Sequence, residues 1–186
     1  MIKKLFLTAA VFLSMFAPAC FEPGAEAGDQ NLQKNGANYV VPDVVLTNQD
    51  GVKVRLRNLL QTNKPVMLDF IYSSCTTTCP VLSAGYASVQ NRIGPDTQKV
   101  QLISITIDPE KDSPRVMKEY LKRYHARPGW DFLTGSVEEI GKVLLAFKTN
   151  EMNDNFFTLV RSSSCEKWTR LVGRLSAAEI QAAYLK

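Results

Sequence analysis

The stretch PVMLDFIYSSCTTTCP, residues 65–80, combines an apolar run with two cysteines at positions 75 and 79. The near-continuous apolar segment from Pro65 to Tyr72 is typical of a central β-strand that is covered on both faces. Pro80 directly follows the second cysteine and suits the first turn of a helix. Cys75 and Cys79 are therefore predicted to lie where a buried strand is followed by a helix.

A pair of thiols at such a junction supports two kinds of chemistry. Residues four apart in a helical turn share a face, so the two sulfurs can converge. The unpaired N–H groups and the positive dipole at a helix start favour the thiolate form of a cysteine. Converging thiolates can close into a reversible disulfide or present two soft ligands to a metal, and the spacing of Cys75 and Cys79 suits both.

The rest of the chain predicts strands that alternate with helices. Segments 40–46 and 52–54 alternate around an Asp-Gly turn, which is typical of a β-hairpin. The other predicted elements are a helical turn over 56–60, a helix over 80–93, a strand over 100–107, a helix over 113–125, a strand over 130–133, a helix over 136–147, a hairpin of strands 156–160 and 168–172, and a final helix over 176–185. This order predicts an α/β protein with a thioredoxin-like fold, in which a central mixed β-sheet is flanked by helices and preceded by a β-hairpin.

The first residues are predicted to direct export. Two lysines precede an apolar run over 5–17, which is shorter than the roughly 20 residues that span a bilayer. Cleavage after residue 27 defines a signal peptide over 1–27. A lipoprotein signal ending at residue 19 is the alternative, and it would leave Cys20 as a lipid anchor and the only membrane attachment. A flexible tether over 28–39 and one compact domain over 40–186 are expected to follow, in a periplasmic or secreted protein.

The charge and the cysteine content limit the classes of molecule with which this protein is expected to interact. The formal net charge is +4, without a cluster of lysines and arginines, so no nucleic-acid partner is predicted. An exported chain with four cysteines, two of them closely spaced, favours an active dithiol over a framework of structural disulfides. Cys165 falls in a predicted hairpin turn. Pairing with Cys20, cross-linking of a partner and no role at all remain open for it.

Three sequence blocks follow one another along the chain: FIYSSCTTTCP over 70–80, ISITIDPEKDSP over 103–114 and WDFLTG over 130–135. In content and order they resemble the Sco/SenC family, and the resemblance covers about residues 40–185. The resemblance implies a thioredoxin fold, Cys75 and Cys79 as copper ligands, and delivery of copper to cytochrome c oxidase or thiol–disulfide exchange during its maturation. It implies as partners an oxidase subunit or another cuproprotein, together with another periplasmic thiol or copper carrier.

The chain departs from the family pattern at the third copper ligand. The family places a histidine a few residues before the penultimate strand, but residues 150–160 read NEMNDNFFTLV. By spacing, Asp154 or Asn153 occupies that place, and the thioether of Met152 is a further candidate ligand because it suits Cu(I). The single histidine, His125, ends a predicted helix and is interpreted as an exposed helix-terminal residue. The chain thus resembles a divergent member of the family.

Three functions follow from these patterns. Two thiolates hold Cu(I) in near-linear geometry, whereas Cu(II) prefers nitrogen and oxygen, so any bound copper is expected to be Cu(I). The first function is therefore copper-centre assembly, with Cu(I) on Cys75 and Cys79. The alternative is an enzyme, a thiol–disulfide oxidoreductase that uses the same pair to reduce an apo-cuproprotein. The third is a non-catalytic assembly module with a residual dithiol.

Overall fold

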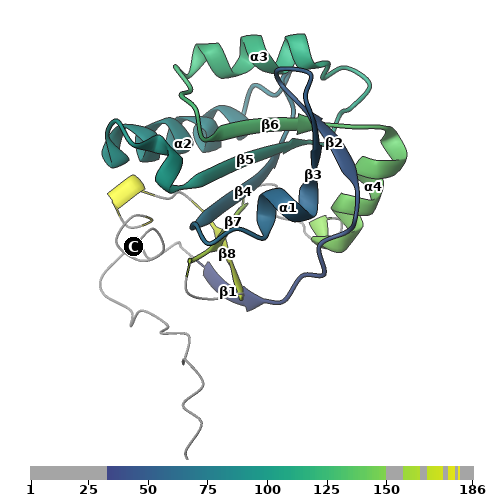
Figure 1. Cartoon of the computed structure of the whole chain (residues 1–186). Helices are drawn as coiled ribbons and strands as arrows, with labels where there is room; N and C mark the ends of the chain where they lie inside the picture. The colour runs from purple at the N-terminus through teal and green to yellow at the C-terminus, as the bar shows by residue number, and fades with distance from the viewer. Residues whose placement is uncertain (1–32, 150–156, 164–166, 174–175, 179, 181–186) are drawn as a thin grey trace, which may run out of the picture.

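The computed structural model describes residues 33–149, 157–163, 167–173, 176–178 and 180, which form one central sheet with helices on both faces (Figure 1). The sheet has eight strands in the order β1-β8-β7-β4-β5-β6-β2-β3. Their bounds are β1 (Gln33–Ala37), β2 (Val45–Asn48), β3 (Lys53–Arg55), β4 (Val66–Ile71), β5 (Gln101–Thr106), β6 (Trp130–Thr134), β7 (Phe157–Arg161) and β8 (Trp168–Val172).

The sheet is mixed, as the sequence predicts. The strand β4 runs parallel to β5 and antiparallel to β7, and β5 runs parallel to β6. The hairpin of β2 and β3 pairs with β6 at one edge of the sheet. The mixed sheet, the flanking helices and the early hairpin confirm the predicted fold class.

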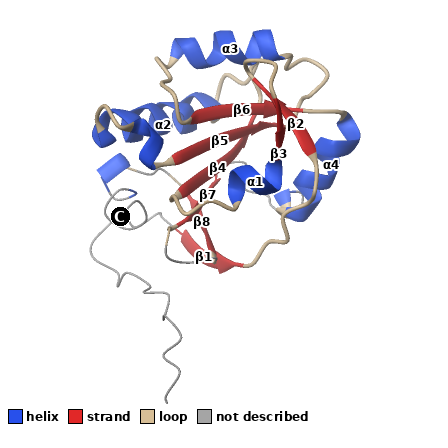
Figure 2. Ribbon diagram, viewed as in Figure 1, coloured by secondary structure: helices blue, strands red, loops and turns tan. Residues whose placement is uncertain are grey.

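The helices cover the two faces of the sheet in pairs (Figure 2). They are α1 (Leu56–Leu60), α2 (Cys79–Ile93), α3 (Pro114–Arg123) and α4 (Val137–Ala146), with a 3-10 turn η1 (Thr97–Lys99). Side chains of α2 and α3 pack into one buried cluster, and those of α1 and α4 pack into another. Successive side chains of β4 point to opposite faces of the sheet, so Met67 and Ile71 lie in the first cluster and Leu68 lies in the second. This two-sided burial explains the near-continuous apolar run.

Local signals begin α3 and α4 where the sequence predicts. The side chain of Ser113 accepts a hydrogen bond from the N–H of Val116 at the start of α3. At the start of α4, Ser136 and Glu139 form a reciprocal capping box. Of the predicted final helix, Ala177, Ala178 and Ile180 are helical among the described residues. The predicted signal peptide over 1–27 lies outside the described residues.

The predicted tether over 28–39 is wrong for Gln33–Ala37, which form the strand β1. This strand pairs antiparallel with β8 from Gln33 opposite Val172 to Ala37 opposite Trp168. Its sequence, QKNGA, has no apolar alternation, because an edge strand gains its stability from backbone hydrogen bonds to a partner that lies far away in the sequence. The folded domain therefore includes residues before position 40.

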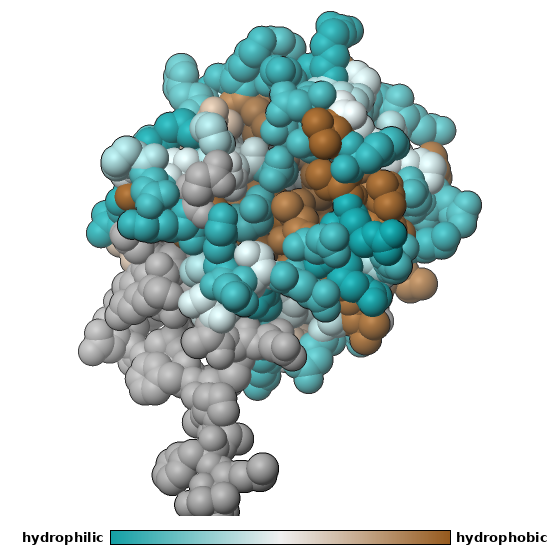
Figure 3. All heavy atoms as spheres, in the orientation of Figure 1, coloured by the Kyte–Doolittle hydropathy of each residue, from teal (hydrophilic) through white to brown (hydrophobic). Residues whose placement is uncertain are grey.

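One face of the molecule carries a cluster of apolar side chains (Figure 3). In this view, hydrophobic residues gather around the β2–β3 hairpin and α1, and the rest of the described surface is mainly hydrophilic. Val45 and Val52 of the hairpin region are 38% and 56% exposed. Within the described part of the chain, no helix is both long enough and apolar enough to cross a membrane.

Candidate functional site

The structure brings Cys75 and Cys79 together at the end of β4. After Ile71 the chain makes a tight turn, in which the N–H of Cys75 donates to the carbonyl of Tyr72 at 3.2 Å. The helix α2 begins at Cys79, and Pro80 lies in its first turn. The N–H of Cys79 donates to Sγ of Cys75 at 3.4 Å. Both thiols are nearly covered, with Cys75 8% and Cys79 4% exposed.

The two thiols differ strongly in acidity. Burial opposes ionisation of Cys75, but hydrogen bonds from Cys79 and from Thr77 outweigh it and lower the pKa of Cys75 to about 6. Burial raises the pKa of Cys79 to about 12, and its hydrogen bond to Cys75 contributes in the same direction. The helix start therefore favours the thiolate at Cys75, which receives the N–H, and leaves Cys79 protonated near neutral pH.

This asymmetry predicts selective alkylation. In the reduced protein at neutral pH, we expect iodoacetamide to modify Cys75 and to leave Cys79 largely intact, because the thiolate is the reactive form. Mass spectrometry of the peptide that contains both cysteines, with fragmentation to locate the label, measures the ratio. The Cys75→Ser variant is the control, since its remaining site thiol should react only at alkaline pH. Equal labelling of the two cysteines would contradict the assignment.

Asp69 lies in the core on the same side of the sheet as the dithiol. It occupies β4 between Met67 and Ile71, both of which belong to the buried cluster that contains Cys79. The residue is 0% exposed, and neither carboxylate oxygen has a hydrogen-bond partner at standard distance among the described residues. Burial raises the pKa of Asp69 to about 7, and the Ser104 hydroxyl offsets part of this rise. The charge on Asp69 in turn raises the pKa of Cys79.

Sequence reasoning missed Asp69, although a signal was present. A single carboxylate inside the apolar run over 65–72 has no reason to be there as a packing residue. A buried, unpaired titratable group close to a reactive thiol is a common mark of a functional site.

Most of the candidates for a third ligand lie outside the described residues. Met152, Asn153 and Asp154 lie outside the described residues, as do Cys20 and Cys165. His125 is an exposed residue two positions after the end of α3, and its N–H donates to the carbonyl of Lys122 at 3.0 Å. Among the described residues, no group of three or more histidine, cysteine or acidic side chains is arranged to hold a metal.

The described donor set is therefore the dithiol itself. Two sulfurs, one in the loop before α2 and one at its first residue, match the preference of Cu(I) for soft ligands and low coordination. The hydroxyls of Thr77 and Thr78 lie 3.9 Å from Sγ of Cys75, and both are hard, neutral donors. Within the described part of the chain, the arrangement fits Cu(I) and offers no nitrogen ligands of the kind that Cu(II) prefers. Two thiols this close in the sequence can also form a reversible disulfide.

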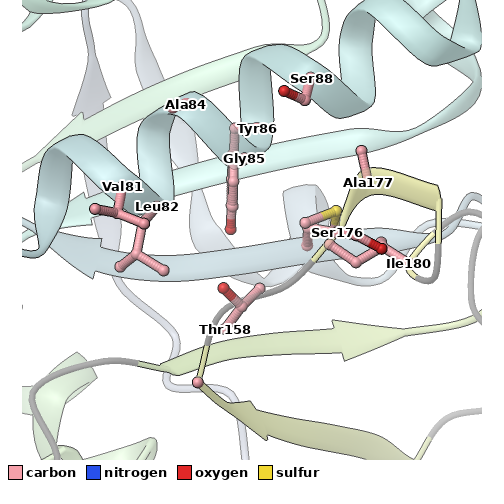
Figure 4. Close-up of a pocket in the computed structure, with 12 residues that line it drawn as sticks. Val81, Leu82, Ala84, Gly85, Tyr86, Ser88, Thr158, Ser176, Ala177 and Ile180 are labelled. Atoms are coloured by element: carbon pink, nitrogen blue, oxygen red, sulfur yellow. The ribbon is translucent and has the colours of Figure 1, made fainter. Parts of the chain in front are cut away.

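A cavity of about 310 Å³ lies beside α2 but is separate from the dithiol (Figure 4). Val81, Leu82 and Tyr86 of α2 line it, together with Thr158 of β7 and Ile180. Neither Cys75 nor Cys79 is among its lining residues. The cavity therefore adds no side chain to the metal or redox chemistry of the pair.

The sequence of this chain matches proteins of a known family. The chain matches the model of the SCO1/SenC family over residues 32–158, which is more than half of its length and begins beside β1. It is 34% identical over 130 residues to the SCO1 protein homolog of Bacillus subtilis (strain 168), a match that covers 69% of this chain and 62% of the relative. A 33% identical match over 82 residues to a SCO2-like protein of Rickettsia typhi covers 44% of this chain and 39% of the relative. The chain thus spans less than two thirds of these relatives.

Solved structures agree with the sequence matches. The copper-bound structure of ScoI from Bradyrhizobium japonicum is 26% identical, with a TM-score of 0.58 over 75% of this chain and 96% of that chain. The structure of BsSco, described as a member of the Sco family of cytochrome c oxidase assembly proteins with a disulfide switch, is also 26% identical. Its TM-score is 0.62 over 81% of this chain and 96% of that chain. With a family model that covers most of the folded domain and a fold shared with Sco structures, the chain belongs to the SCO1/SenC family.

Proposed function

We propose that this protein binds one Cu(I) ion between Cys75 and Cys79 and passes it to a subunit of cytochrome c oxidase or to a related cuproprotein. The observation that carries the proposal is the pair of nearly covered cysteines at the start of α2, where the N–H of Cys79 donates to Sγ of Cys75. The copper-bound structure of a relative and the description of BsSco as an oxidase assembly protein support it. The signal-type N-terminus favours a periplasmic or secreted location for this transfer.

The difference in acidity between the two thiols determines the order in which they would coordinate Cu(I) and how its affinity depends on pH. Cys75 is largely a thiolate at neutral pH, whereas Cys79 must lose its proton when it coordinates the metal. A thiol that coordinates a metal is deprotonated by it, so binding releases protons and strengthens as the pH rises. Cys75 thus provides the first contact for an incoming ion, and Cys79 closes the site.

An anaerobic titration tests the proposal. The reduced protein competes with a chromophoric Cu(I) chelator, and we expect one tightly held Cu(I) per chain. Protein oxidised to the Cys75–Cys79 disulfide is the matched control and should not compete, because neither sulfur is then a thiolate. Failure of the reduced protein to compete would overturn the proposal. A stable, stoichiometric Cu(II)–thiolate signal in electron paramagnetic resonance would contradict the restriction to Cu(I).

The second candidate is a thiol–disulfide oxidoreductase, favoured by the difference in pKa between the two thiols. The Cys75 thiolate would attack a disulfide of an apo-cuproprotein and form a mixed disulfide, releasing one substrate thiol. Cys79, after losing its proton, would attack Cys75 sulfur and release the second substrate thiol. Two electrons pass to the substrate, and the protein is left with the Cys75–Cys79 disulfide. Turnover of such a substrate without Cu(I) binding would favour this candidate.

A further inference from the structure

Ser73, two residues before Cys75, is held by a carboxylate from a distant part of the chain. The N–H of Ser73 donates to both oxygens of Asp112, at 3.3 and 3.2 Å, and the Ser73 hydroxyl donates to Oδ1 of Asp112. The guanidinium of Arg123 also donates a longer hydrogen bond to the carbonyl of Ser73, at 3.4 Å. Ser73 and Asp112 are 39 residues apart in the sequence.

The turn that presents Cys75 contains Ser73. The hydrogen bond from the N–H of Cys75 to the carbonyl of Tyr72 closes a four-residue turn over 72–75, in which Ser73 is the second residue. The conformation of Ser73 therefore helps to determine where Cys75 lies relative to the N–H of Cys79. A contact that holds Ser73 also restricts the position of Cys75.

Asp112 is itself firmly placed. It is 1% exposed, and its N–H donates to the carbonyl of Asp108 at 3.0 Å, immediately before the residue that caps α3. The hydroxyl of Thr106, at the end of β5, donates to Oδ2 of Asp112 at 2.5 Å and accepts from the N–H of Asp108 at 2.9 Å. The carboxylate thus connects the end of β5 and the start of α3 to the turn before the dithiol.

We propose that Asp112 is a positioning residue for the dithiol, which holds Ser73 so that Cys75 is preorganised to bind Cu(I) together with Cys79. The proposal rests on the function proposed above and identifies the residue that holds Cys75 in position at that site. Among the described residues, the hydrogen bonds to the Asp112 side chain come from N–H or O–H donors, so each requires an acceptor oxygen. An asparagine would turn one acceptor into a donor facing these donors, with almost no change in volume.

The test compares Asp112→Asn with Glu110→Gln, which removes the same charge from an exposed position in the same loop. The first measurement is amide hydrogen exchange in the reduced, metal-free proteins. We expect faster exchange over residues 72–79 in Asp112→Asn, with the middle of β5 and of α3 unchanged, and no change in Glu110→Gln. The second measurement is Cu(I) affinity, which we expect to fall about tenfold in Asp112→Asn only, the lower end of what losing an outer-shell partner costs a metal site.

A double-mutant cycle asks whether Asp112 acts through Ser73. Ser73→Ala removes the hydroxyl donor, and Ser73→Thr keeps it. We expect Ser73→Ala to weaken Cu(I) binding, Ser73→Thr to restore it, and the double variant Ser73→Ala/Asp112→Asn to lose less than the sum of the two single losses. Independent, additive losses would overturn the proposal.

The outcomes separate this inference from the proposed function. Unchanged exchange over 72–79 in Asp112→Asn would overturn the positioning role, whatever the copper titration shows. A wild-type protein that does not bind Cu(I) would end the proposed function, while the exchange measurement would still decide the role of Asp112. If Asp112→Asn does not fold, the same exchange measurement is made on Ser73→Ala. Faster exchange throughout the central sheet of that variant, rather than over 72–79, would overturn the proposal.

Discussion

Replacement of either Cys75 or Cys79 by serine is expected to reduce Cu(I) affinity by far more than the roughly 100-fold that loss of an outer-shell partner costs. Each variant removes one of two thiolates and substitutes a hard hydroxyl that stays protonated. The remaining thiolate cannot complete even a two-coordinate site. Anaerobic competition with a chromophoric Cu(I) chelator measures the loss, provided that circular dichroism shows both variants folded.

The matched control is His125→Gln. This variant removes the single imidazole of the chain, which is exposed at the end of α3, and should bind Cu(I) as the wild type does. Wild-type affinity in Cys79→Ser would show that the pair is not the site. The copper ligands would then have to include donors outside the described residues, such as Met152 and Asp154.

Asp69→Asn is expected to remove a large pH dependence of stability. Burial raises the pKa of Asp69 from 3.8 to about 7, so the folded state holds a proton that the unfolded state releases. Proton binding by Asp69 therefore stabilises the folded state fully below about pH 4, and this stabilisation is lost as the pH rises through about 7. Over this range the free energy of unfolding falls by up to about 4 kcal/mol. Asparagine carries no charge, so the variant should lose this slope and become more stable than wild type above neutral pH.

Urea unfolding at a series of pH values from acid to mildly alkaline measures this effect, with the dithiol kept reduced. Glu110→Gln removes an exposed carboxylate and should leave the slope as in wild type. Parallel curves for Asp69→Asn and wild type would show that the carboxyl is ionised without penalty in the folded protein. The variant should also lower the pKa of Cys79 above neutral pH, since the Asp69 charge raises it.

The sequence by itself determined the elements around the dithiol. The apolar run of β4, the Ser113 and Ser136 caps and the proline after Cys79 are local signals, because each depends on residues within a few positions of one another. They predicted the strand, the following helix and the position of the cysteines between them. The absence of a histidine over 150–160 is likewise a property of the sequence alone.

Only the tertiary structure decided the features that depend on distant partners. The strand β1 exists because β8 offers an unpaired edge, and Ser73 is held because the chain returns 39 residues later with Asp112. The pKa of Asp69 is raised because its side chain is buried between β4 and the helices that cover the sheet, which composition cannot show. The spacing of the cysteines predicted a reactive pair, but burial and the direction of one N–H group decided that Cys75 ionises first.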